Sequence, residues 1–310
     1  MFGEMPMKRR SIVAAALGIL LAACASTGGD TELSQLPGDQ LAPFQSDRIS
    51  VVVQGAGPDV ILIPGLTSHR EIWDTTAAAL DDRYRVHLVQ VNGFAGYEPQ
   101  GNADGPVSAP VAEEINRYIA EMHLARPAVI GHSMGGTIGL MLAARHPDAV
   151  GKLMVVDMFP FMGAMFGGQT ADAVRPTADI IRDQMVAAPA PMRRSILEQT
   201  INSMTMTESE RPRLLQHALD SDVRVNASAF HELIVTDLRE EIANIRVPLK
   251  VLYVIPPQAP ISPAQYDAYF HASYARAPQA QLVKIENSWH FIMIDQFDVF
   301  MREVNGFLAD

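Results

Sequence analysis

Ser133 stands between two glycines in the run AVIGHSMGGTIG, after a short apolar stretch (127–130) and before a helical one (137–146). A serine on a sharp turn from strand to helix exposes its hydroxyl, and it needs small neighbours so that strand, turn and helix can pack closely. The helix that follows points unpaired N–H groups at the same place, where they stabilise negative charge. The pattern predicts a nucleophilic serine at position 133.

A serine nucleophile needs a base that takes its proton, an acid that orients the base, and donors that stabilise the oxyanion. Of the nine histidines, His290 follows the short polar loop 287–289, between the last expected strand and the last expected helix. An imidazole titrates near neutral pH, so it can accept the proton and return it to the leaving group. His290 is the predicted base. His132 adjoins Ser133 in sequence, and its side chain is expected to point away.

Short apolar segments alternate with longer amphipathic ones, which indicates an α/β fold with a mostly parallel, twisted sheet flanked by helices. The turn signal at 55–58, between the first two expected strands, indicates an antiparallel pair at the start of the sheet. The expected strands are 49–53, 60–63, 85–91, 128–130, 153–156, 250–255 and 281–285, and the expected helices are 70–81, 108–122, 137–145, 232–243, 263–275 and 294–308.

The segment 158–229 breaks this alternation, because it has no clear strand and contains seven of the sixteen methionines. We interpret it as a helical lid inserted into a core formed by residues 46–157 and 230–310. Methionine is unbranched and adapts to irregular surfaces, so a lid rich in Met and Phe suits a hydrophobic ligand. The alternative is that these side chains only pack the lid on the core.

Four blocks in this order resemble the α/β-hydrolase superfamily, over residues 48–308. They are DVILIPGLTSHREIW (59–73), GHSMGG (131–136), LREEIANIRVPLKVLYVI (238–255) and LVKIENSWHFIMIDQFDVFMREVNGFL (282–308). The resemblance implies the α/β-hydrolase fold, with the lid inserted after strand six of the superfamily. It also implies an oxyanion hole made by two backbone N–H groups, those of Leu66 and Met134.

The superfamily usually places the acid after strand seven, but here the following loop, 256–260, has no carboxylate, and Asp267 lies farther on, inside an expected helix. Some members carry the acid after strand six, where Asp157 follows the strand 153–156. Neighbouring strands lie about 4.8 Å apart, so either strand end can present a carboxylate to the same imidazole. Asp157 is therefore the predicted acid. The alternatives are that Asp157 caps the first lid helix, leaving a Ser–His dyad, or that another carboxylate serves.

These residues predict a serine hydrolase that cleaves carboxylic esters through an acyl-enzyme intermediate and needs no cofactor or metal. The same catalytic residues could hydrolyse lactones and thioesters. A haloperoxidase-like or C–C-bond hydrolase is the alternative within the fold, and a catalytically silent binding lipoprotein is the alternative outside enzymes. The substrate is expected to be a small hydrophobic ester or lactone. The side chains expected to line its pocket are His69, Phe161, Met162, Met165, Phe166 and Trp289.

The N-terminus has the features of an export signal: a basic cluster at 8–10 precedes an apolar run at 12–23 that is too short to span a bilayer. The run ends in Leu-Ala-Ala-Cys, and Cys24 is the only cysteine. This tetrapeptide resembles a bacterial lipobox, which predicts a signal peptide at 1–23, lipidation of Cys24 and a flexible tether at 24–45. The protein is then a membrane-anchored lipoprotein of the cell envelope. Cleavage without lipidation, giving a secreted or periplasmic protein, is the alternative.

The composition, 48% hydrophobic and 19% charged over 310 residues, is that of a globular protein with a sizeable core. The formal net charge of −11 argues against nucleic acid as a partner. The sequence also lacks the spaced Cys/His sets of zinc sites and the glycine-rich signatures of nucleotide-binding loops.

Overall fold

The computed structural model describes residues 43–256, 259 and 261–309. The predicted signal peptide, Cys24 and most of the predicted tether lie outside the described residues. Phe44, near the end of the predicted tether, is partly buried against the core. The Phe44 ring packs 4.9 Å from the Tyr118 ring, between centroids, and the Arg117 guanidinium lies 4.4 Å above Phe44.

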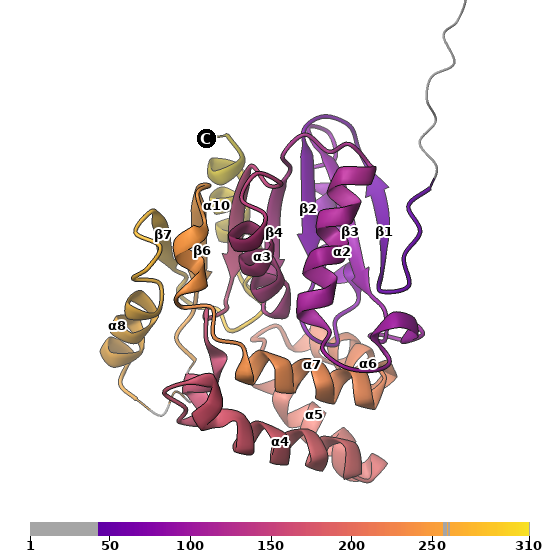
Figure 1. The fold of residues 1–310 in the computed structure, drawn as a ribbon, viewed down its shortest axis with the longest axis vertical. Coiled ribbons are helices and arrows are strands. Elements are labelled where there is room, and N and C mark those ends of the chain that lie inside the picture. The colour runs from indigo at the N-terminus through magenta and orange to yellow at the C-terminus, as the bar shows by residue number, and fades with distance from the viewer. Residues whose placement is uncertain (1–42, 257–258, 260, 310) are drawn as a thin grey trace, which may run out of the picture. The chain divides into compact units, whose positions relative to one another are not determined.

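A sheet of seven strands forms the centre of the fold, in the order β1-β3-β2-β4-β5-β6-β7 (Figure 1). The strands are β1 (Ile49–Gln54), β2 (Asp59–Ile63), β3 (Arg85–Val91), β4 (Ala128–His132), β5 (Lys152–Val156), β6 (Leu249–Tyr253) and β7 (Ala280–Lys284). All neighbours are parallel except β1 and β3. The expected antiparallel pair of the first two strands is therefore wrong: β1 pairs with β3, because β3 lies between β1 and β2 in the sheet.

Two helical layers cover the sheet because successive side chains of each strand point to opposite faces. In β4, Val129 faces the layer of α2 (Ser108–Glu121) and α3 (Met134–Arg145), whereas Ile130 faces the opposite layer. The first layer also includes α8 (Pro263–Ser273). The second includes η1 (Arg70–Trp73), α1 (Asp74–Ala78), α9 (Ile292–Asp295) and α10 (Phe297–Ala309).

Between β5 and β6 the chain forms α4 (Ala171–Ala187), α5 (Ala190–Asn202), α6 (Arg211–Asp220) and α7 (Val223–Val235), together with the short η3 (Met162–Phe166) and η4 (Glu208–Glu210). These helices lie beyond the carboxyl ends of the parallel strands (Figure 1). Counted from Ile49 in this sheet, the insertion follows the fifth strand. Its function as a lid stays a prediction.

Several helix boundaries differ from those expected. The helix expected at 232–243 is wrong, because α7 ends at Val235 and η5 (Glu241–Asn244) is a separate turn. The helix expected at 70–81 divides into η1 and α1, and that expected at 294–308 divides into α9 and α10. No helix in the described part of the chain is long and apolar enough to cross a membrane.

Candidate active site

Ser133 forms the turn between β4 and α3. Its backbone has φ 53° and ψ −120°, and its N–H donates to the Val156 carbonyl at 2.9 Å. Such backbone angles cost about 1–3 kcal/mol in a residue other than glycine and persist only where the surroundings enforce them. Here the close packing does so, since a Cβ at Gly131 would collide with the Gly135 carbonyl and one at Gly135 with the Ile63 carbonyl. The predicted strand–turn–helix geometry is therefore present.

The structure brings His290 and Asp157 together from positions far apart in sequence. Asp157 follows β5, and its Oδ2 lies 2.6 Å from His290 Nδ1. The other carboxylate oxygen, Oδ1, accepts a hydrogen bond from Val254 N–H at 3.1 Å, just beyond β6. The parallel pairing of β5 and β6 thus fixes the carboxylate, and the contact expected from sequence is formed. Burial, together with the negative charge of Asp157, raises the pKa of the neighbouring Tyr274 well above its usual value.

His132 supports the loop that carries His290, which the sequence did not reveal. Its Nε2 lies 3.0 Å from the His290 carbonyl oxygen, and its ring lies 4.6 Å from the His290 ring, between centroids. Burial, with a smaller contribution from the charge of His290, lowers the pKa of His132 well below its usual value. A neutral ring can donate from Nε2 to this carbonyl. The expectation that the His132 side chain points away from the site is therefore wrong.

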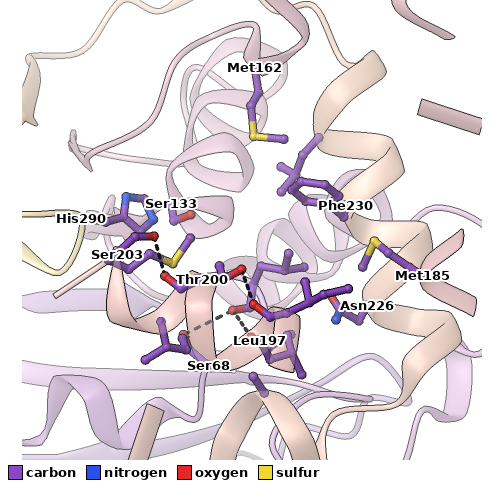
Figure 2. A pocket seen from close by; sticks show the side chains of 18 of the residues that line it. Ser68, Ser133, Met162, Met185, Leu197, Thr200, Ser203, Asn226, Phe230 and His290 are labelled. Carbon is purple, nitrogen blue, oxygen red and sulfur yellow. Dashed lines mark hydrogen bonds between the residues drawn. The ribbon is translucent and has the colours of Figure 1, made fainter. Parts of the chain in front are cut away.

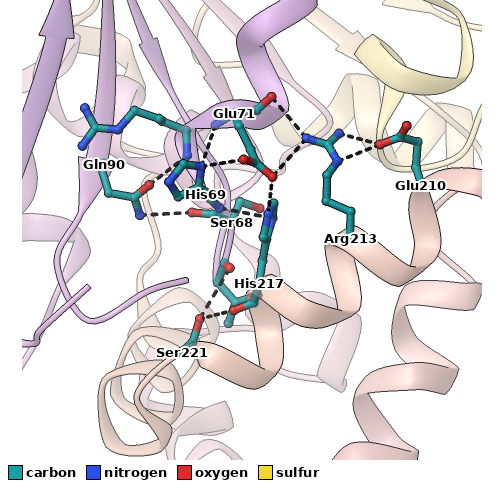
Figure 3. A network of polar contacts seen from close by, with 10 residues as sticks. Ser68, His69, Glu71, Gln90, Glu210, Arg213, His217 and Ser221 are labelled. Atoms are coloured by element: carbon teal, nitrogen blue, oxygen red, sulfur yellow. Dashed lines mark hydrogen bonds and ion pairs between the residues drawn. The ribbon is translucent and has the colours of Figure 1, made fainter. Parts of the chain in front are cut away.

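Leu66, whose N–H is predicted to form the oxyanion hole with that of Met134, lines the same cavity as Ser133. Both residues adjoin the nucleophile: Leu66 lies in the loop after β2, and Met134 is the first residue of α3. Among the described residues neither N–H has a protein acceptor. Gln90 on β3 holds the Leu66 loop, since its Nε2 donates to Ser68 O at 3.3 Å and its Oε1 accepts from Arg70 N–H at 2.8 Å (Figure 3).

Ser133, His290 and Asp157 line a cavity of about 1070 Å³ that extends between the core and the inserted helices. Figure 2 shows Ser133 and His290 together on one side of it. Four of the side chains expected to line the pocket do so: Met162, Met165, Phe166 and Trp289. Further apolar side chains from the insertion are Met185, Met192, Ile196, Leu197 and Phe230.

Two side chains expected in the pocket lie elsewhere. Phe161 is fully buried within the insertion, among Val174, Ala178 and Ile234. His69 caps η1, with its Nδ1 accepting from Glu71 N–H at 3.1 Å, and it faces α6 instead of the cavity (Figure 3). Both expectations are wrong because sequence proximity to the site does not fix the direction of a side chain.

His69, Glu71 and His217 form a cluster whose possible ligand atoms all lie within 4.8 Å of one another. Glu71 Oε1, however, already lies 2.7 Å from His217 Nε2 and 3.4 Å from an Arg213 nitrogen. The guanidinium disfavours a cation at this point, so the arrangement is that of an ion-pair network between α6 and η1 (Figure 3).

A family model for the alpha/beta hydrolase family matches residues 60–303. The chain belongs to the alpha/beta hydrolase family. The fold and the order of the four sequence blocks agree with this assignment. Membership of the family places the protein among the hydrolases.

Similar proteins include hydrolases with different substrates. A pimeloyl-[acyl-carrier protein] methyl ester esterase of Vibrio cholerae is 27% identical over 266 residues, which are 82% of this chain and 96% of the relative. An enol-lactonase from Burkholderia xenovorans has a TM-score of 0.68 at 19% identity, over 84% of this chain and 96% of that one. A bromoperoxidase from Bacillus anthracis has a TM-score of 0.71 at 16% identity, over 84% and 95%. The two structures show likeness of fold.

Proposed function

We propose that the protein is a serine hydrolase that cleaves carboxylic esters of a hydrophobic substrate through an acyl-enzyme intermediate. The observation that carries the proposal is the hydrogen bond between His290 Nδ1 and Asp157 Oδ2, on a cavity that Ser133 also lines. A histidine held by a carboxylate at one ring nitrogen has the other nitrogen free to act as a base. The esterase activity of the Vibrio cholerae relative supports the same reaction class.

In the proposed reaction, Ser133 Oγ attacks the ester carbonyl carbon while His290 Nε2 takes the hydroxyl proton. The carbonyl oxygen becomes an oxyanion, which the Leu66 and Met134 N–H groups stabilise. Collapse of the tetrahedral intermediate breaks the bond to the alcohol, which leaves with the proton from His290. Water then attacks the acyl-enzyme, with His290 again as base, and releases the acid and the serine.

The apolar lining from the insertion supports a hydrophobic acyl or alcohol part, because burial of apolar surface contributes about 25 cal/mol per Å². Four of the expected side chains, Met162, Met165, Phe166 and Trp289, supply part of this lining. The insertion then acts as a lid that covers the apolar part of the bound substrate.

Labelling with a fluorophosphonate tests the proposal, because only an activated serine reacts. We expect the wild type to be labelled and to hydrolyse p-nitrophenyl esters or lactones, and S133A to do neither. A wild type that is neither labelled nor active on these substrates would instead support a silent binding protein.

A further inference from the structure

The cavity contains a buried polar group without a partner, on the side away from the nucleophile. In the described part of the chain, two buried polar side-chain atoms of cavity-lining residues lack a hydrogen-bond partner: His132 Nδ1 and Asn226 Oδ1. His132 adjoins Ser133 and belongs to the site described above. Asn226 lies on α7, and Figure 2 shows it across the cavity from Ser133 and His290.

The position of Asn226 is fixed by the start of α7. Asp222 caps this helix, because its Oδ1 accepts from the N–H groups of Arg224 at 2.8 Å and Val225 at 3.0 Å. The Asp222 N–H in turn donates to the Gly93 carbonyl at 2.8 Å, in the loop after β3. The Asn226 side chain is only 7% exposed, so bulk solvent does not hydrate it.

A buried acceptor such as Asn226 Oδ1 is destabilising when it has no donor, and a donor group on the substrate can remove this cost. The side-chain amide of Asn226 has an acceptor oxygen and a donor nitrogen on the same carbon atom. Which of the two is which is assigned from their hydrogen-bond partners. A hydroxyl both donates and accepts, so it satisfies the amide in either orientation. An ester or ketone oxygen only accepts.

We propose that Asn226 is a subsite for a hydroxyl group of the substrate, so that the preferred esters carry a hydroxyl separated from the scissile ester by an apolar segment. This inference rests on the proposed function and specifies its substrate class. Apolar side chains supply the path between the two ends: Phe230 lies one turn from Asn226 on α7, and Met185 and Leu197 flank Asn226 in the view of Figure 2.

The test compares methyl esters of ω-hydroxyalkanoic acids of increasing length with the matched methyl alkanoates. At the length that reaches Asn226, we expect the wild type to show a kcat/KM about tenfold higher for the hydroxy ester, which is the size of effect that one unpaired buried polar group produces. Asn226→Leu keeps the branching and the number of side-chain heavy atoms and has no polar atom, so it should remove this preference and improve hydrolysis of the unsubstituted ester.

Asn202→Leu is the matched control, since Asn202 is exposed on α5 and is not part of the cavity wall. It should keep the wild-type preference. A wild type that hydrolyses both series equally at every length would overturn the inference and leave the proposed function intact. A wild type inert toward both series and toward the fluorophosphonate would remove the proposed function itself.

Thermal unfolding gives a readout independent of activity. Replacing an unpartnered buried amide by an apolar group of the same shape is neutral or stabilising, so N226L should have a Tm equal to or above that of the wild type. A clearly lower Tm would show that the amide has a structural partner and would overturn the inference.

Discussion

Ser133 combines a hydroxyl at the cavity wall with backbone angles that only its close-packed glycine neighbours make possible. Because the contacts that enforce the turn are made by backbone atoms, the hydroxyl contributes little to the fold. We expect Ser133→Ala to abolish ester hydrolysis and leave the Tm within a degree or so of the wild-type value. Steady-state kinetics and calorimetry measure both, and residual hydrolysis at about a tenth of the wild-type rate would contradict the assignment.

Asp157 holds the His290 ring by the 2.6 Å contact to Nδ1. The carboxylate keeps the imidazole in the tautomer that leaves Nε2 free and stabilises the imidazolium formed during attack; its loss costs about 10⁴ in rate in a serine protease. Asp157→Asn should therefore lower kcat by at least about 10²-fold, with little change in Tm.

Asp267→Asn is the matched control for the acid. Asp267 lies on α8 and accepts a hydrogen bond from the Tyr253 hydroxyl of β6. It makes no hydrogen bond to His290 in the described structure. The control should keep kcat near the wild-type value. If D267N lost activity and D157N kept it, the acid would have been assigned to the wrong carboxylate.

At the level of elements, α6 is joined to η1 by the contacts of Glu71 with His217 and Arg213. These groups are partly exposed, so the ion pair between Glu71 and Arg213 contributes at most about 1 kcal/mol. The network still positions α6, which supplies part of the cavity wall, next to the loop that carries Leu66.

This junction predicts a pH dependence of stability. Burial lowers the pKa of His217 below its usual 6.5, although the hydrogen bond to Glu71 opposes the shift. Between the folded pKa and 6.5 the unfolded chain binds more protons than the folded one, so the free energy of unfolding falls as the pH drops below about 6.5. His217→Gln removes the titrating group and should make this fall shallower.

Urea unfolding at a series of pH values measures the effect. Above about pH 8 the wild-type imidazole is neutral in both states, so there the two proteins should differ by a constant offset. Parallel curves for wild type and H217Q across the acidic range would contradict the prediction.

At the level of the whole molecule, the predicted export signal and Cys24 bear on the location of the protein in the cell. We propose that Cys24 is lipidated and becomes the new N-terminus, and that the tether connects the catalytic core to the membrane. Cys24→Ser should then shift the protein from the membrane fraction to soluble or unprocessed material and leave hydrolysis by the core unchanged. Fractionation followed by immunoblotting checks this, and unchanged membrane association of the Cys24→Ser variant would refute lipidation. An N-terminal peptide of the wild type with the mass of the unmodified sequence would refute it as well.

The sequence by itself determined the family, the strand positions and the turn that carries Ser133, because these depend on local patterns: apolar runs, amphipathic periods and glycines at fixed spacing. It also located His290 through the short polar loop before the last helix. Asp157 could be predicted because the acid's usual loop lacks a carboxylate, so the neighbouring strand end remained. Its contact with His290, across 133 residues, was nevertheless a prediction until the sheet order was seen.

The tertiary structure alone decided which way side chains face and which distant segments meet. His69 and Phe161 follow strand ends, as pocket residues do, yet His69 caps η1 and Phe161 packs within the insertion. The pairing of β1 with β3, the support of His290 by His132 and the unpartnered amide of Asn226 have no local signature. Each arises from contacts between segments far apart in the chain, which are set by how the sheet, the helices and the insertion pack together.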